Sequence, residues 1–371
     1  MKRHVVVALS GGVDSAVCAA LLLEQGFRVT GLFMKNWEDD DRDGFCPSAE
    51  DYQSARAVAE ILEIPLHAAN FAPEYRTRVF ARFLRDCEAG LTPNPDILCN
   101  REIKFDVFWH RAQALGADLM ATGHYARLAE HHGTLRLVAG RDPDKDQSYF
   151  LHTIDPAILP FLRFPIGDFT KTEIRARAEA LGLPNADRKG SSGICFIGER
   201  RFPPFLKRYL KGVRGAIYSV DGEHLGHHEG LMFYTLGQRR GLGLGGPGEA
   251  WYVADKRLVD NALIVAQGAE HPSLYKPRCR TAAADWLGPA PALPWQGLAK
   301  IRYRQQAFPL RVLPDPDAPC GLLLEFAEPQ RAVTPGQSAV FYEADGVCLG
   351  GAIIRAEGIS QQDTHPVPQS R

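Results

Sequence analysis

The chain has 371 residues and a formal net charge of −1, with 45% hydrophobic and 23% charged residues, an ordinary balance for a globular protein too long for one core. The near-neutral charge excludes a global attraction for nucleic acid, so an RNA partner would need local basic patches. No apolar run is long enough to span a membrane, and the first residues enter a strand with no room for a signal peptide. We therefore expect two or three domains and a cytoplasmic location, without membrane association.

The first predicted element is a buried strand over residues 4–9, which feeds into Ser-Gly-Gly-Val-Asp-Ser at 10–15 and an apolar helical pattern. Glycines there allow backbone N–H groups to converge on a phosphate, and the helix N-terminus adds partial positive charge. Asp14 could hold Mg²⁺, and Ser10 or Ser15 could reach phosphate oxygens. The alternative is a turn that needs glycine only for its backbone angles, but the flanking serines and aspartate favour phosphate binding.

The next segments alternate between strand and helix, which predicts a parallel sheet. Ligands of such sheets bind beyond the carboxyl ends of the strands, where Met34, Phe71 and Gly123 fall on the same edge as the glycine loop. The predicted strands cover 28–34, 65–71 and 118–122, and the predicted helices cover 48–62, 73–87 and 102–115.

Beyond residue 123 the sequence no longer alternates regularly between strand and helix. A hairpin is predicted around His132-Gly133, and Thr170 opens a capping-box helix that ends at Gly182, with Ile174, Ala178 and Leu181 on one face. Residues 188–199 are predicted to form a loop and residues 202–210 a short basic helix. Asp221-Gly222 indicates a hairpin in a small mixed domain. Residues 300–304 alternate like a strand of a small all-β barrel or sandwich, which has a turn at Pro335-Gly336.

Two cysteine-centred segments are loop-like and polar, unlike the surroundings of a core cysteine. In residues 90–100 two prolines rigidify the chain that presents Asn94, Asp96 and Cys99, and in residues 190–196 glycines surround Cys195. Two thiolates near cations could attack in turn and finish as a disulfide; the alternative is two unreactive thiols. Cys46 is ambiguous, and packing roles are expected for Cys18, Cys87, Cys279, Cys320 and Cys348.

Taken together, these stretches resemble the bacterial tRNA-specific 2-thiouridylases, a family of PP-loop ATP pyrophosphatases. One departure is Gly190-Ser191-Ser192, where Asp-Ser-Thr is expected, so the carboxylate that would activate Cys195 is missing. The motifs that carry the resemblance are SGGVDS, GLFMKNW, TPNPDILCN with IKF, ATGHY, KDQSYF, GICFIGER, TLGQR with GLG, RYRQ, and VTPGQSAVFY with CLGG.

The resemblance implies an α/β fold with a Rossmann-like parallel-sheet PP-loop domain of the adenine nucleotide α-hydrolase type. It implies this domain over 1–200, a small mixed α/β central domain over 201–275, a C-terminal β-barrel that contacts tRNA over 276–360, and a polar tail over 361–371. The implied reaction is ATP- and Mg²⁺-dependent 2-thiolation of the wobble uridine of tRNA. The implied partners are the tRNA anticodon stem-loop and a persulfide-carrying relay protein or cysteine desulfurase.

The resemblance also implies a role for individual residues. Cys195 would carry sulfur as a persulfide, Cys99 would be the nucleophile that resolves it through a transient Cys99–Cys195 disulfide, and Asp96 would act as acid/base. The ATP site would comprise Ala8, Leu9, Ser10, Gly11, Gly12, Val13, Asp14, Ser15, Met34 and Gly123. The target base and the rest of the tRNA would contact Asn94, Pro95, Asp96, His124, Lys145, Asp146, Gln147, Arg302, Tyr303 and Gln337.

Without the resemblance, plainer interpretations are available. His124 reads as a satisfied histidine at a strand end, Arg302 and Arg304 as a solvated strand face, and Tyr303 as core. Two other functions also stay open: a PP-loop ligase or amidotransferase that adenylates a small substrate, and a non-catalytic tRNA-binding protein. A glutamine-fed amidotransferase would need a glutaminase domain or partner, and no nucleophilic cysteine follows Met1.

Overall fold

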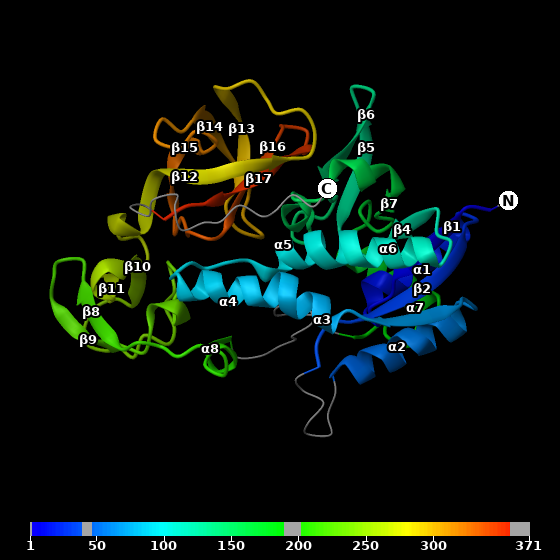
Figure 1. Ribbon diagram of the computed structural model, residues 1–371, viewed down its shortest axis with the longest axis horizontal. Coiled ribbons are helices and arrows are strands. Elements are labelled where there is room, and N and C mark those ends of the chain that lie inside the picture. Colours follow the sequence, from blue (N-terminus) through cyan, green and yellow to red (C-terminus); the bar gives the residue numbers. More distant parts are fainter. Residues whose placement is uncertain (1, 39–46, 189–201, 357–371) are drawn as a thin grey trace.

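The computed structural model describes residues 2–38, 47–188 and 202–356, which form a parallel sheet with helices on both faces, a smaller sheet and a barrel (Figure 1). The parallel sheet has the order β3-β2-β1-β4-β7. The valine-rich β1 (His4–Ala8) is buried at every position because it lies in the centre of this sheet. Its neighbours are β2 (Arg28–Lys35), β3 (Leu66–Asn70), β4 (Leu119–Ala121) and β7 (Leu162–Arg163).

Alternate side chains of β1 enter two different cores, as the two-residue period of a strand requires. Val5 and Val7 pack with α1 (Val13–Glu24), α2 (Pro47–Ile61) and α7 (Lys171–Ala180). Val6 packs on the other side with the helices between β3 and β4. Those helices are α3 (Ala72–Glu74), α4 (Ala81–Glu88), α5 (Pro95–Cys99) and α6 (Phe108–Ala114), with π-helical turns at Tyr75–Phe80 and Asn100–Val107 between them.

The remainder of the described chain forms two β-rich units. A four-stranded sheet has the order β10-β11-β8-β9 and follows the short helix α8 (Phe202–Leu206). Its strands are β8 (Gly215–Ser219), β9 (His224–His228), β10 (Trp251–Arg257) and β11 (Ala262–Gln267). A closed barrel is built from β12 (Tyr275–Trp286), β13 (Trp295–Lys300), β14 (Phe308–Pro314), β15 (Leu322–Arg331), β16 (Ser338–Tyr342) and β17 (Cys348–Ile354).

A hairpin of β5 (Ala126–His131) and β6 (Thr134–Ala139) joins the first unit to the barrel. Val138 forms a β-bridge with Val347, and the N–H of Ala139 donates to the carbonyl of Gly346 at 2.9 Å. Single 3₁₀ turns complete the described secondary structure at Ser148–Leu151, Pro156–Phe161, Leu231–Phe233, Leu258–Asp260 and Pro272–Leu274.

The predicted fold class is confirmed: a Rossmann-like parallel sheet, then a small central unit, then a β-barrel. The capping box is present in full, since the Thr170 side chain accepts from the Glu173 N–H and the Glu173 carboxylate accepts from the Thr170 N–H. Leu181, however, is exposed rather than on the buried face, because α7 ends at Ala180, one residue before it.

Three further expectations are corrected. Residues 95–99 are helical rather than loop, because Asn94 caps α5 and Pro95 takes the first helical position, which needs no N–H donor. The strand predicted over 300–304 ends at Lys300, because the Gln305 side chain accepts from the Ile301 N–H and closes a turn. Cys320 is exposed rather than packed, since it lies in the turn between β14 and β15.

Candidate functional site

The glycine loop between β1 and α1 is ordered by its two serines. The Ser15 hydroxyl accepts from the Ser10 N–H at 3.1 Å and donates to the Gly12 carbonyl at 3.0 Å. The Ser10 hydroxyl lies 3.1 Å from that of Ser15 and belongs to an exposed residue. The loop therefore has its shape before any ligand arrives, with Ser10 facing outward.

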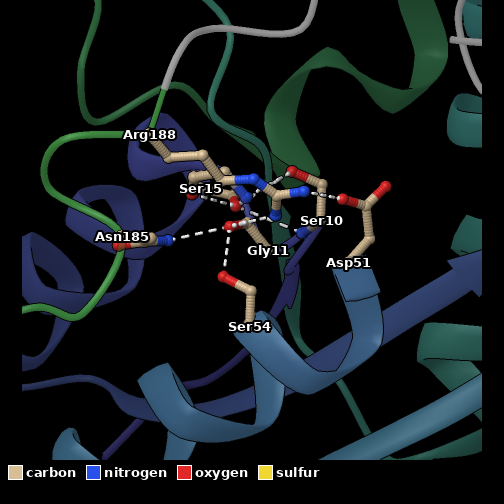
Figure 2. A network of polar contacts seen from close by, with 8 residues as sticks. Ser10, Gly11, Ser15, Asp51, Ser54, Asn185 and Arg188 are labelled. Atoms are coloured by element: carbon tan, nitrogen blue, oxygen red, sulfur yellow. Dashed lines mark hydrogen bonds and ion pairs between the residues drawn. The ribbon is translucent and has the colours of Figure 1, made fainter. Parts of the chain in front are cut away.

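The Gly11 carbonyl accepts hydrogen bonds from three side chains of the same unit (Figure 2). The donors are Ser54 Oγ at 2.8 Å, Asn185 Nδ2 at 2.9 Å and Arg188 Nη1 at 3.2 Å; Arg188 also pairs with Asp51. Because the C=O and the N–H of one peptide point in opposite directions, the Gly12 N–H lies on the far side of this peptide from the three donors, where it donates to Ser10 Oγ at 3.4 Å.

Position 11 requires glycine on two counts. Its φ of +80° lies in the left-handed region, and a Cβ there would lie 2.3 Å from the backbone oxygen of Asp51. Gly123, just after β4, is constrained by close contact alone, since a Cβ would lie 2.8 Å from the Ser15 nitrogen. The loop is thus packed closely between α2 and the chain after β4.

Asp14, in the first turn of α1, lies between a lysine and a tyrosine. Its Oδ1 accepts from Lys171 Nζ at 2.6 Å and from the Tyr125 hydroxyl at 2.7 Å. Burial, and then the Asp14 carboxylate, raise the pKa of Tyr125, so its hydroxyl stays protonated and donates. A cation and a carboxylate side by side at such a loop can hold a phosphate and a phosphate-bound cation respectively.

The end of β2 supplies the next part of this edge. Met34 is buried, and Asn36, two residues further, is 1% exposed. Both amide atoms of Asn36 lack a hydrogen-bond partner among the residues that the structure describes. Because an unsatisfied buried amide costs about 1–3 kcal/mol, a ligand at this edge would be stabilised by bonding to it.

The segment that carries Asn94 and Asp96 leads into α5. The Asn94 side chain accepts from the Asp96 N–H at 3.1 Å, which sets Asp96 in the first helical turn. Cys99, at the end of α5, is fully buried and is not in a disulfide. The proposed nucleophile is therefore enclosed in this conformation.

His124 is buried beside Lys104 and packs near Phe105 and Phe164. Its Nδ1 lies 2.7 Å from Thr122 Oγ1, and its Nε2 lies 3.5 Å from Lys104 Nζ. Burial, and then the Lys104 charge, hold the pKa of His124 well below its ordinary value. The imidazole is accordingly neutral and enclosed rather than presented to a surface.

Asp146 and Gln147 hydrogen-bond to residues of the barrel and of the first unit. Asp146 is 4% exposed; its Oδ2 accepts from Lys300 Nζ of the barrel at 2.7 Å, and its Oδ1 accepts from the Gly140 N–H at 2.9 Å. Gln147 Oε1 accepts from the Tyr125 N–H at 3.0 Å. These contacts fix the first unit against the barrel, while the neighbouring Lys145 is half-buried.

The predicted tRNA-contacting residues of the barrel have different surroundings. Arg302 is exposed, and its Nη1 donates to the carbonyl of Arg331 at 3.1 Å. The Tyr303 ring lies 4.5 Å, between centroids, from that of Phe150. Gln337 Nε2 donates to the Thr92 carbonyl at 2.6 Å, which brings the barrel to the segment before α5.

Models of three protein families match the chain in order. They are described as a tRNA methyl transferase HUP domain over residues 3–199, a tRNA methyl transferase PRC-barrel domain over 204–267 and an aminomethyltransferase beta-barrel domain over 276–354. The tRNA-specific 2-thiouridylase of Methylococcus capsulatus is 53% identical over 95% of this chain and 96% of its own length. The enzyme of the same name from Chromohalobacter salexigens is 53% identical over 95% of this chain and 92% of its own length. That of Nitrosomonas eutropha is 51% identical over 95% of this chain and 98% of its own length.

The chain belongs to the tRNA-specific 2-thiouridylase family. The resemblance found in the sequence motifs is confirmed.

Several residues at the family's loop were not singled out from the sequence. Lys171 is the first residue of α7, directly after the cap Thr170, and only the fold brings it to Asp14. Ser54 and Arg188 lie far from the loop in the chain. A lysine at a helix N-terminus, where the helix dipole disfavours cations, is the one signal that could have indicated Lys171.

Cys195 and Cys46 lie outside the described residues, but one end of the Cys195 segment is placed. Arg188, seven residues before Cys195, bonds to the Gly11 carbonyl. The last residue described before the Cys195 segment is thus held at the glycine loop.

A cleft of about 1090 Å³ lies at the opposite edge of the parallel sheet, where the strands begin. Lys2, Arg28, Pro65 and Asp118 line it, and all four lie at or just before strand starts. Because ligands of parallel sheets bind at the carboxyl edge, we place the site at the glycine loop rather than in this cleft. No helix in the described ranges has the length and apolar character needed to cross a membrane.

Proposed function

We propose that this chain is an ATP-dependent tRNA-uridine 2-sulfurtransferase that converts the wobble uridine, position 34, to 2-thiouridine. The observation that carries the proposal is the preordered loop at residues 10–15, whose Gly11 carbonyl is held by three side chains and whose Gly12 N–H donates to the hydroxyl of the exposed Ser10, beside the Asp14–Lys171 pair. The names of the relatives support the choice of tRNA and of sulfur.

In the first step, the uracil C2 oxygen attacks the α-phosphorus of ATP, and the bond to the β-phosphate breaks to release pyrophosphate. The loop amides and the N-terminus of α1 would hold the departing pyrophosphate. Lys171 would turn from Asp14 to a phosphate oxygen as charge develops there. Met34 and Asn36 would face the adenine, with Gly123 closing the opposite side.

In the second step, the terminal sulfur of a Cys195 persulfide attacks C2. The Cys99 thiolate attacks the Cys195 Sγ, the persulfide S–S bond breaks, and AMP leaves with the former C2 oxygen, so C2 becomes a thiocarbonyl. The products include a Cys99–Cys195 disulfide, which an external thiol must reduce. Because Cys99 is buried, this step requires α5 to open.

Magnesium would bind through Asp14 together with ATP phosphates. One carboxylate plus substrate phosphates is a usual Mg²⁺ environment in phosphate-transfer sites. Among the described residues, no group of three or more potential metal ligands lies at the loop, so the residues fit an ion carried in by the nucleotide rather than a resident one. Bound there, Mg²⁺ would neutralise phosphate charge.

We assign the anticodon stem-loop to the space between the first domain and the barrel. Asn94, Pro95 and Asp96 would surround the flipped uracil, with Asp96 as acid/base. Arg302 and Tyr303 would contact the RNA, as would Lys145 and Gln337; His124 and Asp146, both buried, would act from behind this surface. We also propose domain bounds at 1–200, 201–275 and 276–360, with a polar tail at 361–371. The sulfur would come from a relay partner in the cytoplasm, where tRNA is modified.

The descriptions of the two matching tRNA methyl transferase families favour a second candidate, methyl transfer to tRNA. Methylation needs no phosphate-binding loop and releases no pyrophosphate, whereas the ordered loop at residues 10–15 suits a nucleotide phosphate. The loop is equally compatible with a PP-loop ligase that adenylates another acceptor.

One experiment distinguishes these functions. Unmodified tRNA is incubated with the protein, ATP, Mg²⁺ and a sulfide source, and the nucleosides are analysed by mass spectrometry while AMP and pyrophosphate are measured. We expect sulfur in place of one oxygen at a single anticodon uridine, with AMP formed only when tRNA is present. A methyl group at that uridine, or no tRNA-dependent AMP, would exclude the proposal.

A further inference from the structure

Thr92 lies on the segment between α4 and α5, and three of its polar groups bond to the two other domains. Its Oγ1 accepts from Lys256 Nζ of β10 at 3.3 Å. Its N–H donates to the carbonyl of Pro335 at 2.9 Å, and its carbonyl accepts from Gln337 Nε2 at 2.6 Å, both from the turn before β16. A single residue of the first domain thus joins the central sheet and the barrel.

The backbones around Thr92 are in close contact. Gly336 has a φ of +91°, and a Cβ there would lie 2.9 Å from the Thr92 nitrogen. Gly90 has a φ of +77°, and a Cβ there would lie 2.4 Å from Leu258 Cδ2 of the central domain. Figure 1 shows the end of α4 reaching the place where the barrel and the central sheet approach each other. The junction therefore leaves little freedom for residues 90–92 to shift.

Among these contacts to Thr92, the one from Lys256 is made by a charged group, the side-chain ammonium. Its Nζ donates to the Gly90 carbonyl at 3.1 Å as well as to Thr92. Burial lowers the pKa of Lys256 to about 8, with Cys87 opposing the shift. Because burying an ammonium costs free energy, an apolar side chain would serve better if this position were needed for packing alone. The bonds to residues 90 and 92 are what the lysine adds.

We propose that Lys256 is a positioning residue, which fixes residues 90–92, and through them the Asn94 cap and α5, relative to the two domains that hold the tRNA. This inference rests on the proposed function. Because a misplacement of about 1 Å at a reacting centre can cost about 100-fold in rate, the register between the bound tRNA and Asp96 must be set by contacts of this kind.

The test compares Lys256→Met, which keeps an unbranched side chain, with Thr92→Val, which removes only the hydroxyl. We expect K256M to lower kcat for thiolation about ten-fold while the Kd for tRNA stays within about two-fold. The T92V effect should be smaller, because T92V removes only one of the two bonds that K256M removes, and for the same reason the effects should not add in the double variant. Lys256→Arg should recover much of the rate.

Lys207→Met is the matched control, since Lys207 is a lysine of the same domain that pairs with Glu229 at the surface. An unchanged kcat in K256M overturns the inference, as does a loss explained by weaker tRNA binding that K256R does not repair. If the wild-type protein makes no thiouridine, the proposed function fails instead. Hydrogen exchange of residues 90–96 then decides: faster exchange in K256M than in wild type supports the positioning role, and equal exchange refutes it.

Discussion

The glycine loop and the segment before α5 are held in different ways. The loop takes its bonds from its own domain, with Ser54, Asn185 and Arg188 on the Gly11 carbonyl. The segment before α5 takes its bonds from the other two domains, through Lys256 and Gln337. We therefore expect the proposed ATP site to form within the first domain alone, whereas the proposed base pocket would need all three domains.

The two regions also differ in how far their proposed functional side chains are exposed to solvent. At the glycine loop Ser10 is exposed and Asp14 is half-buried, so both side chains reach solvent in this conformation. Cys99, by contrast, is fully buried. We therefore expect adenylation to be separable from sulfur transfer, and the latter to depend on a movement of α5.

The largest effect should come from the cysteines. Cys99→Ser and Cys195→Ser should each abolish thiolation, because neither hydroxyl can form or resolve a persulfide, while tRNA binding stays nearly intact. Pyrophosphate release in the presence of tRNA should persist, as measured by a coupled assay. Cys320→Ser, at an exposed site on the barrel, is the control. Full thiolation by either variant would contradict the two-cysteine mechanism, and loss of pyrophosphate release would show that the regions do not act separately.

A smaller effect is expected from Lys171→Met. The Lys171 side chain is 16% exposed and its ammonium lies at the carboxylate of Asp14, so the substitution removes a partly desolvated cation from the loop. We expect KM for ATP to rise about ten-fold, with Kd for tRNA unchanged. Lys2→Met, at the opposite edge of the sheet, serves as the control. An unaltered KM for ATP would remove Lys171 from the nucleotide site.

The smallest effect concerns pH. His124 is buried and its pKa is lowered from 6.5, so below pH 6.5 the unfolded chain binds a proton that the folded chain refuses. The free energy of unfolding should therefore fall by up to about 1.4 kcal/mol per pH unit below that value, and stay level above it as far as this group is concerned. Urea unfolding between pH 5 and 8 measures this.

His124→Gln should flatten that slope, whereas His110→Gln, at an exposed position, should leave it unchanged. Part of the slope should remain in H124Q, because burial also lowers the pKa values of His152 and His228. An identical slope in H124Q and wild type would mean that His124 is protonated when folded.

Patterns among neighbouring residues predicted secondary structure most reliably. The valine run predicted β1, and the Thr170 capping box predicted the start of α7, because both depend on neighbours in the chain. The errors lie where a local signal was overlooked or a distant one decided. Asn94-Pro95 was interpreted as a rigid loop although it is also a helix start, and residues 300–304 alternate like a strand but end in a turn closed by Gln305.

By itself, then, the sequence determined the order of the elements, the fold class, the loop at residues 10–15 and the family. Only the tertiary structure decided that Gly11 is held by α2 and the chain after α7, that Lys171 meets Asp14, that Cys99 is enclosed, and that Thr92 joins three domains. The physical reason is separation along the chain: turns, caps and strand periods follow from adjacent residues, whereas these contacts join residues tens to hundreds of positions apart and exist only once the sheets have packed.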